Sequence, residues 1–242
     1  MNRSRSYSTG SLKLATYLTD FFALSHDDRE RRSMEFRTRF TDATCLTVSH
    51  GDMTPMRQAW ADESYVHANG FAKLVAFVTE CGRFRLRVHV WPQGSRTDNL
   101  NVHNHRYAFA SYVERGSVED VLWFPAESGD VFRRFIYTSR DASGNYRHEY
   151  TGTQALQVGS VRRVHTGQLY SLSAEHFHYT LPAPSSVTVT YFAEDRRKLL
   201  PSAITYSRHH AMDEVETFTP SLSHDAYQEA LREFACGDVV LP

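Results

Sequence analysis

Two histidines separated by a single residue are the first feature of this chain that could do chemistry. His103 and His105 lie in the segment NVHNHRYAFASYVERG, where apolar and polar residues alternate as they do in a β-strand. Because every second residue of a strand points to the same face, we expect both imidazoles to leave one face of a strand over residues 102–113. If that face is the inside of a barrel, one metal ion can accept a nitrogen from each ring.

A second histidine block supplies candidates for a third ligand. The segment GQLYSLSAEHFHYT places His176 and His178 at the same parity of another expected strand, so either ring can face the first pair. An isolated His-X-His pair is more typical of a protein surface or of hydrogen-bonded core histidines. Here, however, Gly116 marks a turn that closes the first strand, and enough chain separates the two blocks to wrap around a barrel. We therefore predict a mononuclear metal site in a chain that carries 13 histidines.

The elements that must position these histidines form a long run of β-type sequence. From Gly70 onward, short segments rich in β-branched and aromatic residues are separated by Gly, Pro, Asn and Ser. Before Gly70, apolar residues recur at helical spacing, and Ser223 can cap a helix near the C-terminus. The predicted fold class is mainly β, a single barrel with helices at both ends. Its expected parts are a disordered tail (1–10), a helical segment packed on the barrel (11–69), the barrel (70–195) and a C-terminal extension with a helix (196–242).

Composition narrows the classes of partner. The 27 Lys and Arg residues nearly balance the 28 Asp and Glu residues, so no overall field favours nucleic acid or an anionic membrane. The three cysteines are widely spaced, which fits neither a disulfide framework nor a zinc knuckle. No secretory leader and no membrane-spanning apolar run stand out. We expect a cytoplasmic protein that binds neither nucleic acid nor membrane; its oligomeric state is open, and a homodimer is compatible with the sequence.

Both histidine blocks resemble the two motifs of the cupin superfamily. In the first motif a glycine precedes a His-X-His pair and another follows it, as Gly94 and Gly116 do here. In the second motif a glycine is followed eleven residues later by the last ligand histidine, which is the spacing from Gly167 to His178. The resemblance implies a cupin-type double-stranded β-helix, or jelly-roll barrel. The metal ligands that it implies are His103, His105 and His178.

The same resemblance bears on the kind of chemistry. Most cupins add a carboxylate ligand three or four residues after the histidine pair, where this chain has Phe109 and Ala110. His176 is then either a residue that contacts the ligands without binding the metal or the alternative third ligand. A site of three histidines is similar to that of the thiol dioxygenases, of which cysteine dioxygenase is the best known, and this similarity implies Fe(II) and O2. Because imidazole also suits Ni, Mn and Zn, these metals stay open as alternatives.

Candidate substrate-binding residues lie on the strands that precede the histidine pair and just after it. In cysteine dioxygenase an arginine holds the substrate carboxylate, whereas the nearest cation at that place here is Lys73. On the strand 84–91, the face with Arg87, His89 and Trp91 is either solvated or, as the resemblance implies for Trp91, turned into the pocket. An inward Arg87 would bind a carboxylate with two hydrogen bonds. Tyr107 shares the parity of His105 and is either a core aromatic residue or a hydrogen-bonding partner of the substrate.

Departures from the thiol dioxygenases argue against plain cysteine oxidation. Ala110 stands where the family has the cysteine of its Cys-Tyr crosslink, and the positions of its Ser-His-Tyr relay carry Thr188, Thr190 and Phe192. The leading hypothesis is a non-heme Fe(II)-dependent dioxygenase or oxidase that acts on a small amino acid or thiol, such as L-cysteine or a derivative, in specialised biosynthesis. Its partners are then a small-molecule substrate and O2. The alternatives are a non-redox metal-dependent cupin, such as an isomerase or lyase, and a small-molecule-binding cupin.

Overall fold

Helices at both ends of the chain flank two antiparallel sheets in the computed structural model. The structure describes residues 2–48, 55–67, 70–95, 101–137, 145–208, 217–219 and 221–235. The helices are α1 (Asn2–Ala23), α2 (His26–Arg31), α3 (Ser33–Val48), α4 (Pro55–Asp62) and α5 (His224–Ala235). The strands of the first sheet are, in spatial order, β1 (Tyr65–Val66), β2 (Ala72–Val78), β3 (Phe84–Trp91), β12 (Thr188–Asp195), β5 (Ala108–Arg115) and β10 (Leu169–Leu172). Those of the second sheet are β11 (Phe177–Pro182), β4 (Val102–His103), β13 (Ala203–Ser207), β7 (Asp130–Tyr137), β9 (His148–His165) and β6 (Ser117–Ala126). A short pair joins β14 (Thr217–Phe218) to β8 (Asn145–Tyr146).

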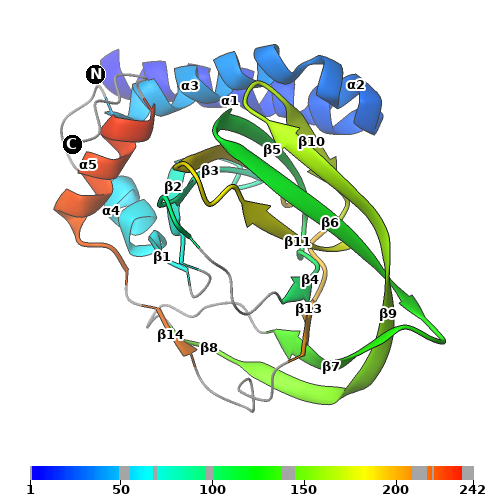
Figure 1. The fold of residues 1–242 in the computed structure, drawn as a ribbon. Helices are drawn as coiled ribbons and strands as arrows, with labels where there is room; N and C mark the ends of the chain where they lie inside the picture. Colours follow the sequence, from blue (N-terminus) through cyan, green and yellow to red (C-terminus); the bar gives the residue numbers. More distant parts are fainter. Residues whose placement is uncertain are drawn as a thin grey trace.

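The chain passes back and forth between the two sheets, which is the strand order of a jelly-roll barrel. It leaves the first sheet after β5 and enters the second at β6, and it crosses again from β10 to β11 and from β11 to β12. The second sheet closes on itself, because β6, β9 and β7 curve around until β7 pairs with β13 and β13 with β4 (Figure 1). The predicted fold class, mainly β with helices before the barrel and a short helix after it, is confirmed.

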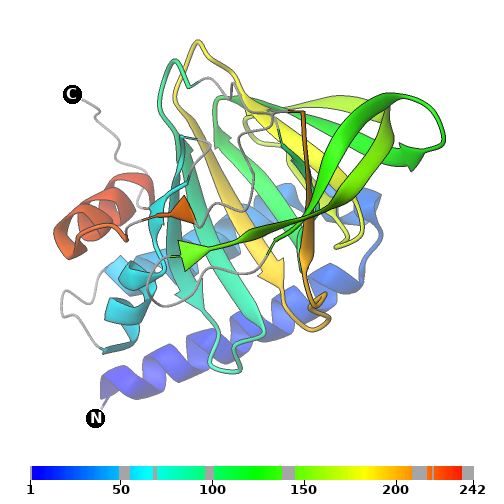
Figure 2. The same cartoon turned by 90° about the horizontal axis from the view of Figure 1, so that it is seen from below.

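Helices cover one face of the first sheet. Apolar side chains of α1 and α3, among them Phe21 and Phe40, pack against Leu86, Val88 and Tyr191 of the sheet. Figure 2 shows the long helix α1 lying across these strands. Burial of so many large apolar side chains provides the main stabilisation of this layer. Among the helices in the described ranges, none is both long and apolar enough to cross a membrane.

The opposite face of the first sheet lines the interior of the barrel. On β5, Phe109 and Val113 join Val118, Tyr170 and Phe192 in a second apolar cluster between the sheets. A third cluster, on the other face of β6, fills the curl of the second sheet; its buried members are Val102, Val121, Trp123, Phe132, Leu156 and Tyr206. The space between the two sheets is therefore where the candidate site residues must meet.

Four sequence expectations differ from the structure. Residues 2–10, expected to be disordered, form the first turns of α1. Three strands expected between residues 146 and 164 are the single strand β9, whose residues pair with β6 and β7 in turn. The strand expected over 102–113 is broken into β4 and β5. Finally, the barrel does not end at residue 195, because β13 from the expected C-terminal extension pairs with β4 and β7.

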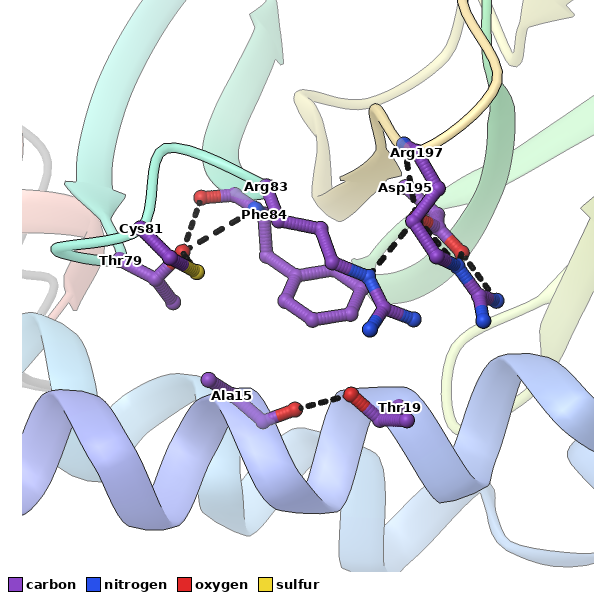
Figure 3. A network of polar contacts seen from close by, with 8 residues as sticks. All are labelled: Ala15, Thr19, Thr79, Cys81, Arg83, Phe84, Asp195 and Arg197. Atoms are coloured by element: carbon purple, nitrogen blue, oxygen red, sulfur yellow. Dashed lines mark hydrogen bonds and ion pairs between the residues drawn. The ribbon is translucent and has the colours of Figure 1, made fainter.

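The turn between β2 and β3 is tied to the end of β12. Arg83 in this turn donates from Nε to Oδ1 of Asp195 at 3.3 Å, and Arg197 donates from Nη2 to Oδ2 of the same carboxylate at 2.7 Å. The Oγ1 atom of Thr79 accepts a hydrogen bond from the backbone N–H of Phe84 at 3.1 Å. These contacts, seen in Figure 3, fix the register of the two strands that carry much of the barrel's inner face.

Substituting Gly116 by alanine is expected to destabilise the fold by more than about 2 kcal/mol. Gly116 turns the chain from β5 to β6 with a φ of 76°, and a Cβ there would lie 2.6 Å from Oγ1 of Thr188 and 2.9 Å from the carbonyl oxygen of Val187. Gly70 is a matched control, because it has the same φ of 76° and no atom within 4 Å of the added Cβ. Urea unfolding of both variants measures the difference, and equal losses would contradict the steric argument.

Candidate metal centre

The register between β4 and β11 places His103 directly opposite His178. Opposed residues of an antiparallel pair project from the same face with Cβ atoms about 4.5–5.5 Å apart. The two ring centroids accordingly lie 5.1 Å apart. Pairing of β11 with β6 and of β4 with β13 fixes this register from both sides. The core of the site is therefore a cross-strand histidine pair, formed by residues 75 positions apart in the chain.

His105 reaches the same point from outside any strand. It lies two residues after the end of β4. The prediction that His105 meets His103 is correct, but the reason given for it, alternation along one strand, was wrong. The side chain of Asn104 holds this connection: its Nδ2 donates to the carbonyl of Ala174 at 3.1 Å, and its Oδ1 accepts from the N–H of Ile204 at 2.6 Å. Arg106 adds a bond from Nε to the carbonyl of Leu200 at 2.9 Å. These contacts give the connection a fixed shape.

The three imidazoles surround one point. The ring centroids of His105 lie 5.0 Å from those of His103 and 5.2 Å from those of His178. One potential ligand atom from each ring lies within 4.8 Å of the other two. The structure thus brings together the three histidines that the sequence singled out, and no other such group of His, Cys, Asp or Glu occurs in the described ranges.

In His103 and His178, hydrogen bonds determine which ring nitrogen keeps a lone pair for a metal ion. Nδ1 of His178 lies 2.6 Å from Oδ1 of Asp120, and Nδ1 of His103 lies 2.9 Å from the carbonyl oxygen of Asn101. A carboxylate and a carbonyl can only accept, so both Nδ1 atoms must carry the hydrogen. The Nε2 atom of each neutral ring is then a bare lone pair, as in the carboxylate–histidine pairs that orient metal ligands.

Asp120 is a buried carboxylate with two partners. Its second oxygen accepts from Nε of Arg162 at 3.0 Å, and its side chain has no exposed surface. Burial raises the pKa of Asp120, but the hydrogen bond with His178 and the charge of Arg162 outweigh burial, so its pKa is lowered and it stays ionised. Asp120 was not predicted. The sequence pattern that could have revealed it is a carboxylate in register with Val118 and Leu122, the apolar residues of β6 that face the barrel interior.

Burial also sets the charge of the rings themselves. Removal from water lowers the pKa of His103 to about 4 and that of His105 well below its ordinary value, and the neighbouring histidines act in the same direction. Both rings are therefore neutral at physiological pH without having to lose a proton to a ligand. Neutral imidazole is the form that binds a metal ion.

The donor set fits a single transition-metal ion. Nε2 of His105 lies 3.0 Å from Nε2 of His178, and two nitrogens bound to one ion at about 2.0–2.1 Å are separated by roughly 3 Å. The three donors are all imidazoles, a set that suits Fe, Ni, Zn and Cu alike. The spacing of His105 and His178 is therefore that of two ligands of one ion.

Replacing Asp120 with asparagine is expected to lower affinity for a divalent metal by about 10- to 100-fold, because an amide cannot supply the charge that holds His178 in its ligand tautomer. Competition against a chelator measures this. Glu119→Gln is the matched control, since the neighbouring Glu119 points to the other face of β6 and pairs with Arg163 at 3.5 Å. Equal metal affinity in Asp120→Asn and wild type would show that this hydrogen bond does not set the ligand.

Aromatic rings line the space around the histidines. Phe109 packs edge-on against His105 at 4.7 Å between centroids and stacks on Phe192 at 4.6 Å. Tyr107 lies 5.6 Å from His105. These apolar walls lie beside rings that are half-buried in His103 and His105 and buried in His178, and they strengthen the electrostatic interactions of polar groups held against them.

The face of β3 with Arg87, His89 and Trp91 points into the barrel and is buried, so its interpretation as a solvated face was wrong. Arg87, however, already donates from Nε to Oε1 of Glu194, and both side chains are nearly inaccessible to water. The charge of Arg87 is therefore already compensated by a buried carboxylate of the protein. Glu194 was not predicted, although a glutamate directly after the uncharged run TVTYFA of β12 was a visible signal.

The remaining substrate candidates lie on the same inner face. Lys73 pairs in register with His89, which in turn pairs with Thr190 of β12. Trp91 stacks on Phe71 at 4.8 Å. The hydroxyl of Tyr107 lies beside Glu194, whose negative charge adds to burial in raising the pKa of Tyr107. Lys73, His89, Trp91 and Tyr107 thus share the barrel interior with the histidines.

His176 does not join the three-histidine group. Its Nδ1 lies 2.7 Å from Oγ of Ser173, and its ring lies 6.5 Å from that of His26 on α2. Although it shares the parity of His178, it precedes the first residue of β11, so strand alternation does not control its direction. Glu114 lies on the opposite face of β5 from Phe109 and forms an ion pair with Arg37 of α3 at 2.6 Å.

Comparison with known proteins finds similarity in structure only. No protein-family model and no curated protein matches the sequence. Hydroxypropylphosphonic acid epoxidase from S. wedmorenis matches with a TM-score of 0.35 and 10% identity over 55% of this chain, and this chain spans about half (53%) of the epoxidase. The cupin domain of Cnp3 from Schizosaccharomyces pombe matches with a TM-score of 0.30 and 9% identity, covering 52% of this chain and 64% of that one. A Bacillus subtilis oxalate decarboxylase variant matches with a TM-score of 0.34 and 9% identity, covering 56% and 28%. The fold class of this chain rests on its own strand order.

Proposed function

We propose that this protein is a metal-dependent enzyme of cupin type, a non-heme Fe(II) dioxygenase or oxidase that acts on a small amino acid or thiol. The observation that carries the proposal is the convergence of His103, His105 and His178, with ligand atoms within 4.8 Å of one another. The lack of a carboxylate among these donors is the feature that resembles the thiol dioxygenases. When bound, an iron ion would supply the redox chemistry with O2.

The chain's own residues would position the reactants. His103 and His178 present Nε2 lone pairs because Asn101 and Asp120 hold their Nδ1 hydrogens. Phe109 and Phe192 exclude water from the inner side of the site. Polar groups of the first sheet, among them Lys73 and His89, would orient the substrate from the opposite wall.

Oxygen uptake tests this proposal directly. Fe(II)-loaded protein is expected to consume O2 in an oxygen electrode with at least one member of a panel of thiols and amino acids that includes L-cysteine and 3-mercaptopropionate. The Zn-loaded protein and the His178→Ala variant serve as controls and should consume none. Stoichiometric metal binding without O2 uptake for any member would favour a non-redox metal-dependent cupin, and absence of metal binding would reject both.

A further inference from the structure

An arginine of β9 lies behind the carboxylate that holds the third histidine of the metal centre. Asp120 of β6 is opposed to Arg162 of β9 on one side and to Thr180 of β11 on the other, so these three side chains form a row across adjacent strands. His178 precedes Thr180 by two residues and projects from the same face of β11. The register therefore places Arg162 and His178 on opposite sides of Asp120.

The two oxygens of Asp120 have different partners. Oδ1 lies 2.6 Å from Nδ1 of His178 and accepts a long hydrogen bond of 3.5 Å from Thr180. Oδ2 accepts a hydrogen bond from Nε of Arg162 at 3.0 Å, and Nη2 of the same guanidinium lies 2.9 Å from it. A carboxylate that is held at both oxygens cannot rotate without breaking one of these contacts. Arg162 therefore fixes which oxygen faces the histidine.

The guanidinium of Arg162 is itself held from other sides. Its central carbon lies 4.9 Å from the centre of the Tyr170 ring, and Nη1 lies 3.8 Å from Oε1 of Glu30 on α2. The side chain of Glu30 is 47% exposed, so solvent screens this longer contact, whereas the side chain of Asp120 has no exposed surface. The contact with Asp120 is therefore the stronger of the two ion pairs.

The neighbouring cross-strand pair provides a comparison within the same two strands. Glu119 and Arg163 are opposed in the same register, but they project from the other face of β6 and β9. Their charged atoms lie 3.5 Å apart, and their side chains are 35% and 65% exposed. Both pairs join an acid of β6 to an arginine of β9, but of the two acids it is Asp120 that contacts a histidine of the metal centre. The outer pair is thus a matched control for the inner one.

We propose that Arg162 is a positioning residue of the metal centre, which acts through Asp120 to keep the Nε2 lone pair of His178 available to the ion. This inference rests on the proposed function for the presence of an ion, and it adds a residue of β9 to those that set metal affinity. Without Arg162, the Asp120 carboxylate is free to turn and lacks its buried cation. His178 then loses the acceptor that keeps its hydrogen on Nδ1, and the tautomer with hydrogen on Nε2 cannot bind the ion through that nitrogen.

A double-mutant cycle on metal affinity tests the proposal. Zn(II) affinity is measured by chelator competition for the full chain, for Arg162→Met, for Asp120→Asn and for the double variant. Arg162→Met is expected to lower the affinity by about 3- to 10-fold, at the low end of effects of residues around metal ligands because it acts through one intermediate side chain. In the Asp120→Asn background the same substitution should cause no further loss, because the residue through which it acts is already changed. Arg163→Met should match wild type.

The cycle separates positioning from two other roles. Equal losses of affinity in both backgrounds would show that Arg162 supports the fold in general, which would overturn the proposal. A gain of affinity in Arg162→Met would show that the arginine acts on the ion as a repelling charge, and this result would overturn the proposal as well.

Histidine NMR of the metal-free chain gives a readout that needs no ion. With 15N-labelled histidine, His178 of the wild type should show one tautomer, with its hydrogen on Nδ1, and its signals are assigned by their loss in His178→Ala. Arg162→Met should show both tautomers, whereas Arg163→Met should match wild type. An unchanged tautomer of His178 in Arg162→Met would contradict the proposal.

A second substitution covers the effect of Arg162 on stability. Arg162→Met leaves a buried carboxylate without its cation, which is destabilising, so urea unfolding is measured on each variant. If Arg162→Met does not fold, Arg162→Gln takes its place, because an amide N–H can still donate to Oδ2 although it supplies no charge. Arg162→Gln should show the same two changes with a smaller loss of affinity, about two- to threefold. Wild-type behaviour in both readouts would then reject the proposal.

The two readouts also separate this inference from the proposed function. A chain that binds no Zn(II) or Fe(II) would reject the proposed function, and the tautomer of His178 would still decide whether Arg162 controls this ring. Wild-type tautomer and affinity in Arg162→Met would reject the inference and leave the three-histidine site and the proposed function standing.

Discussion

Replacing His178 with alanine is expected to lower the affinity of the protein for a divalent metal ion by more than about 100-fold. This loss is larger than that expected for removing a residue that only hydrogen-bonds a ligand histidine. The reason is geometric. His178 is opposed to His103 in the register and lies 3.0 Å, nitrogen to nitrogen, from His105, so its removal leaves two donors. Metal content after dialysis and chelator competition measure the loss. His103→Ala should behave in the same way.

His176→Ala is the matched control for this prediction. It removes a histidine of the same segment and parity, but one whose Nδ1 is engaged by Ser173. Its metal content should equal that of wild type. If His176→Ala lost the ion and His178→Ala kept it, the assignment of the third ligand would be reversed. Retention of metal in both variants would reject the three-histidine site.

Acidification from pH 7.5 to pH 5 is expected to destabilise the metal-free protein by several kcal/mol. Burial lowers the pKa of His67 to about 3 and the pKa values of His103 and His148 to about 4, and those of His89 and His105 also fall well below the ordinary value. Each such ring binds a proton more readily in the unfolded chain. Protons therefore favour unfolding as pH falls below about 6.5. For a ring with a folded-state pKa near 4, the free energy of unfolding is lower by about 2 kcal/mol at pH 5.

Urea unfolding of the metal-free chain at both pH values measures this effect. His148→Phe is a useful variant, because His148 packs against the rings of Phe135 and Tyr137 and a phenyl ring should fill the same place. The variant should lose less stability on acidification than wild type. The buried acids Asp120 and Glu194, whose pKa values are lowered, add a further loss only at lower pH. An unfolding free energy that stays constant or rises between pH 7.5 and pH 5 would contradict the prediction.

The closure of the second sheet explains why the candidate site depends on the whole chain. β4 has only two residues, and it is held between β11 and β13, which lie far along the chain. The connection that carries His105 is held through Asn104 and Arg106 by residues 174, 200 and 204. The residues after the expected barrel boundary at 195 are therefore part of the site's support rather than an appendage.

The sequence by itself determined the elements and the residue types of the site. Its content of β-branched and aromatic residues predicted β2, period-two alternation predicted β3 and the inward face of β5, and helical spacing predicted α1. Ser223 predicted α5 as its cap, and its side chain accepts a hydrogen bond from the N–H of Ala226. These predictions succeed because periodicity reports which side chains are buried. The spacing resemblance also pointed to His178 over His176, a choice that the grouping of the three rings supports in geometry.

Only the tertiary structure decided which groups meet. β3 is buried on both faces, one against helices and one towards the barrel, so no alternation of polar and apolar residues could tell that Arg87 and His89 point inward. The pairing of Arg87 with Glu194, and of His178 with Asp120, joins residues more than fifty positions apart through strand register. Register depends on contacts along the whole length of neighbouring strands and on the turns between them, which local spacing does not contain. The sequence thus identifies the pair His103 and His105, but the fold determines which residues surround it.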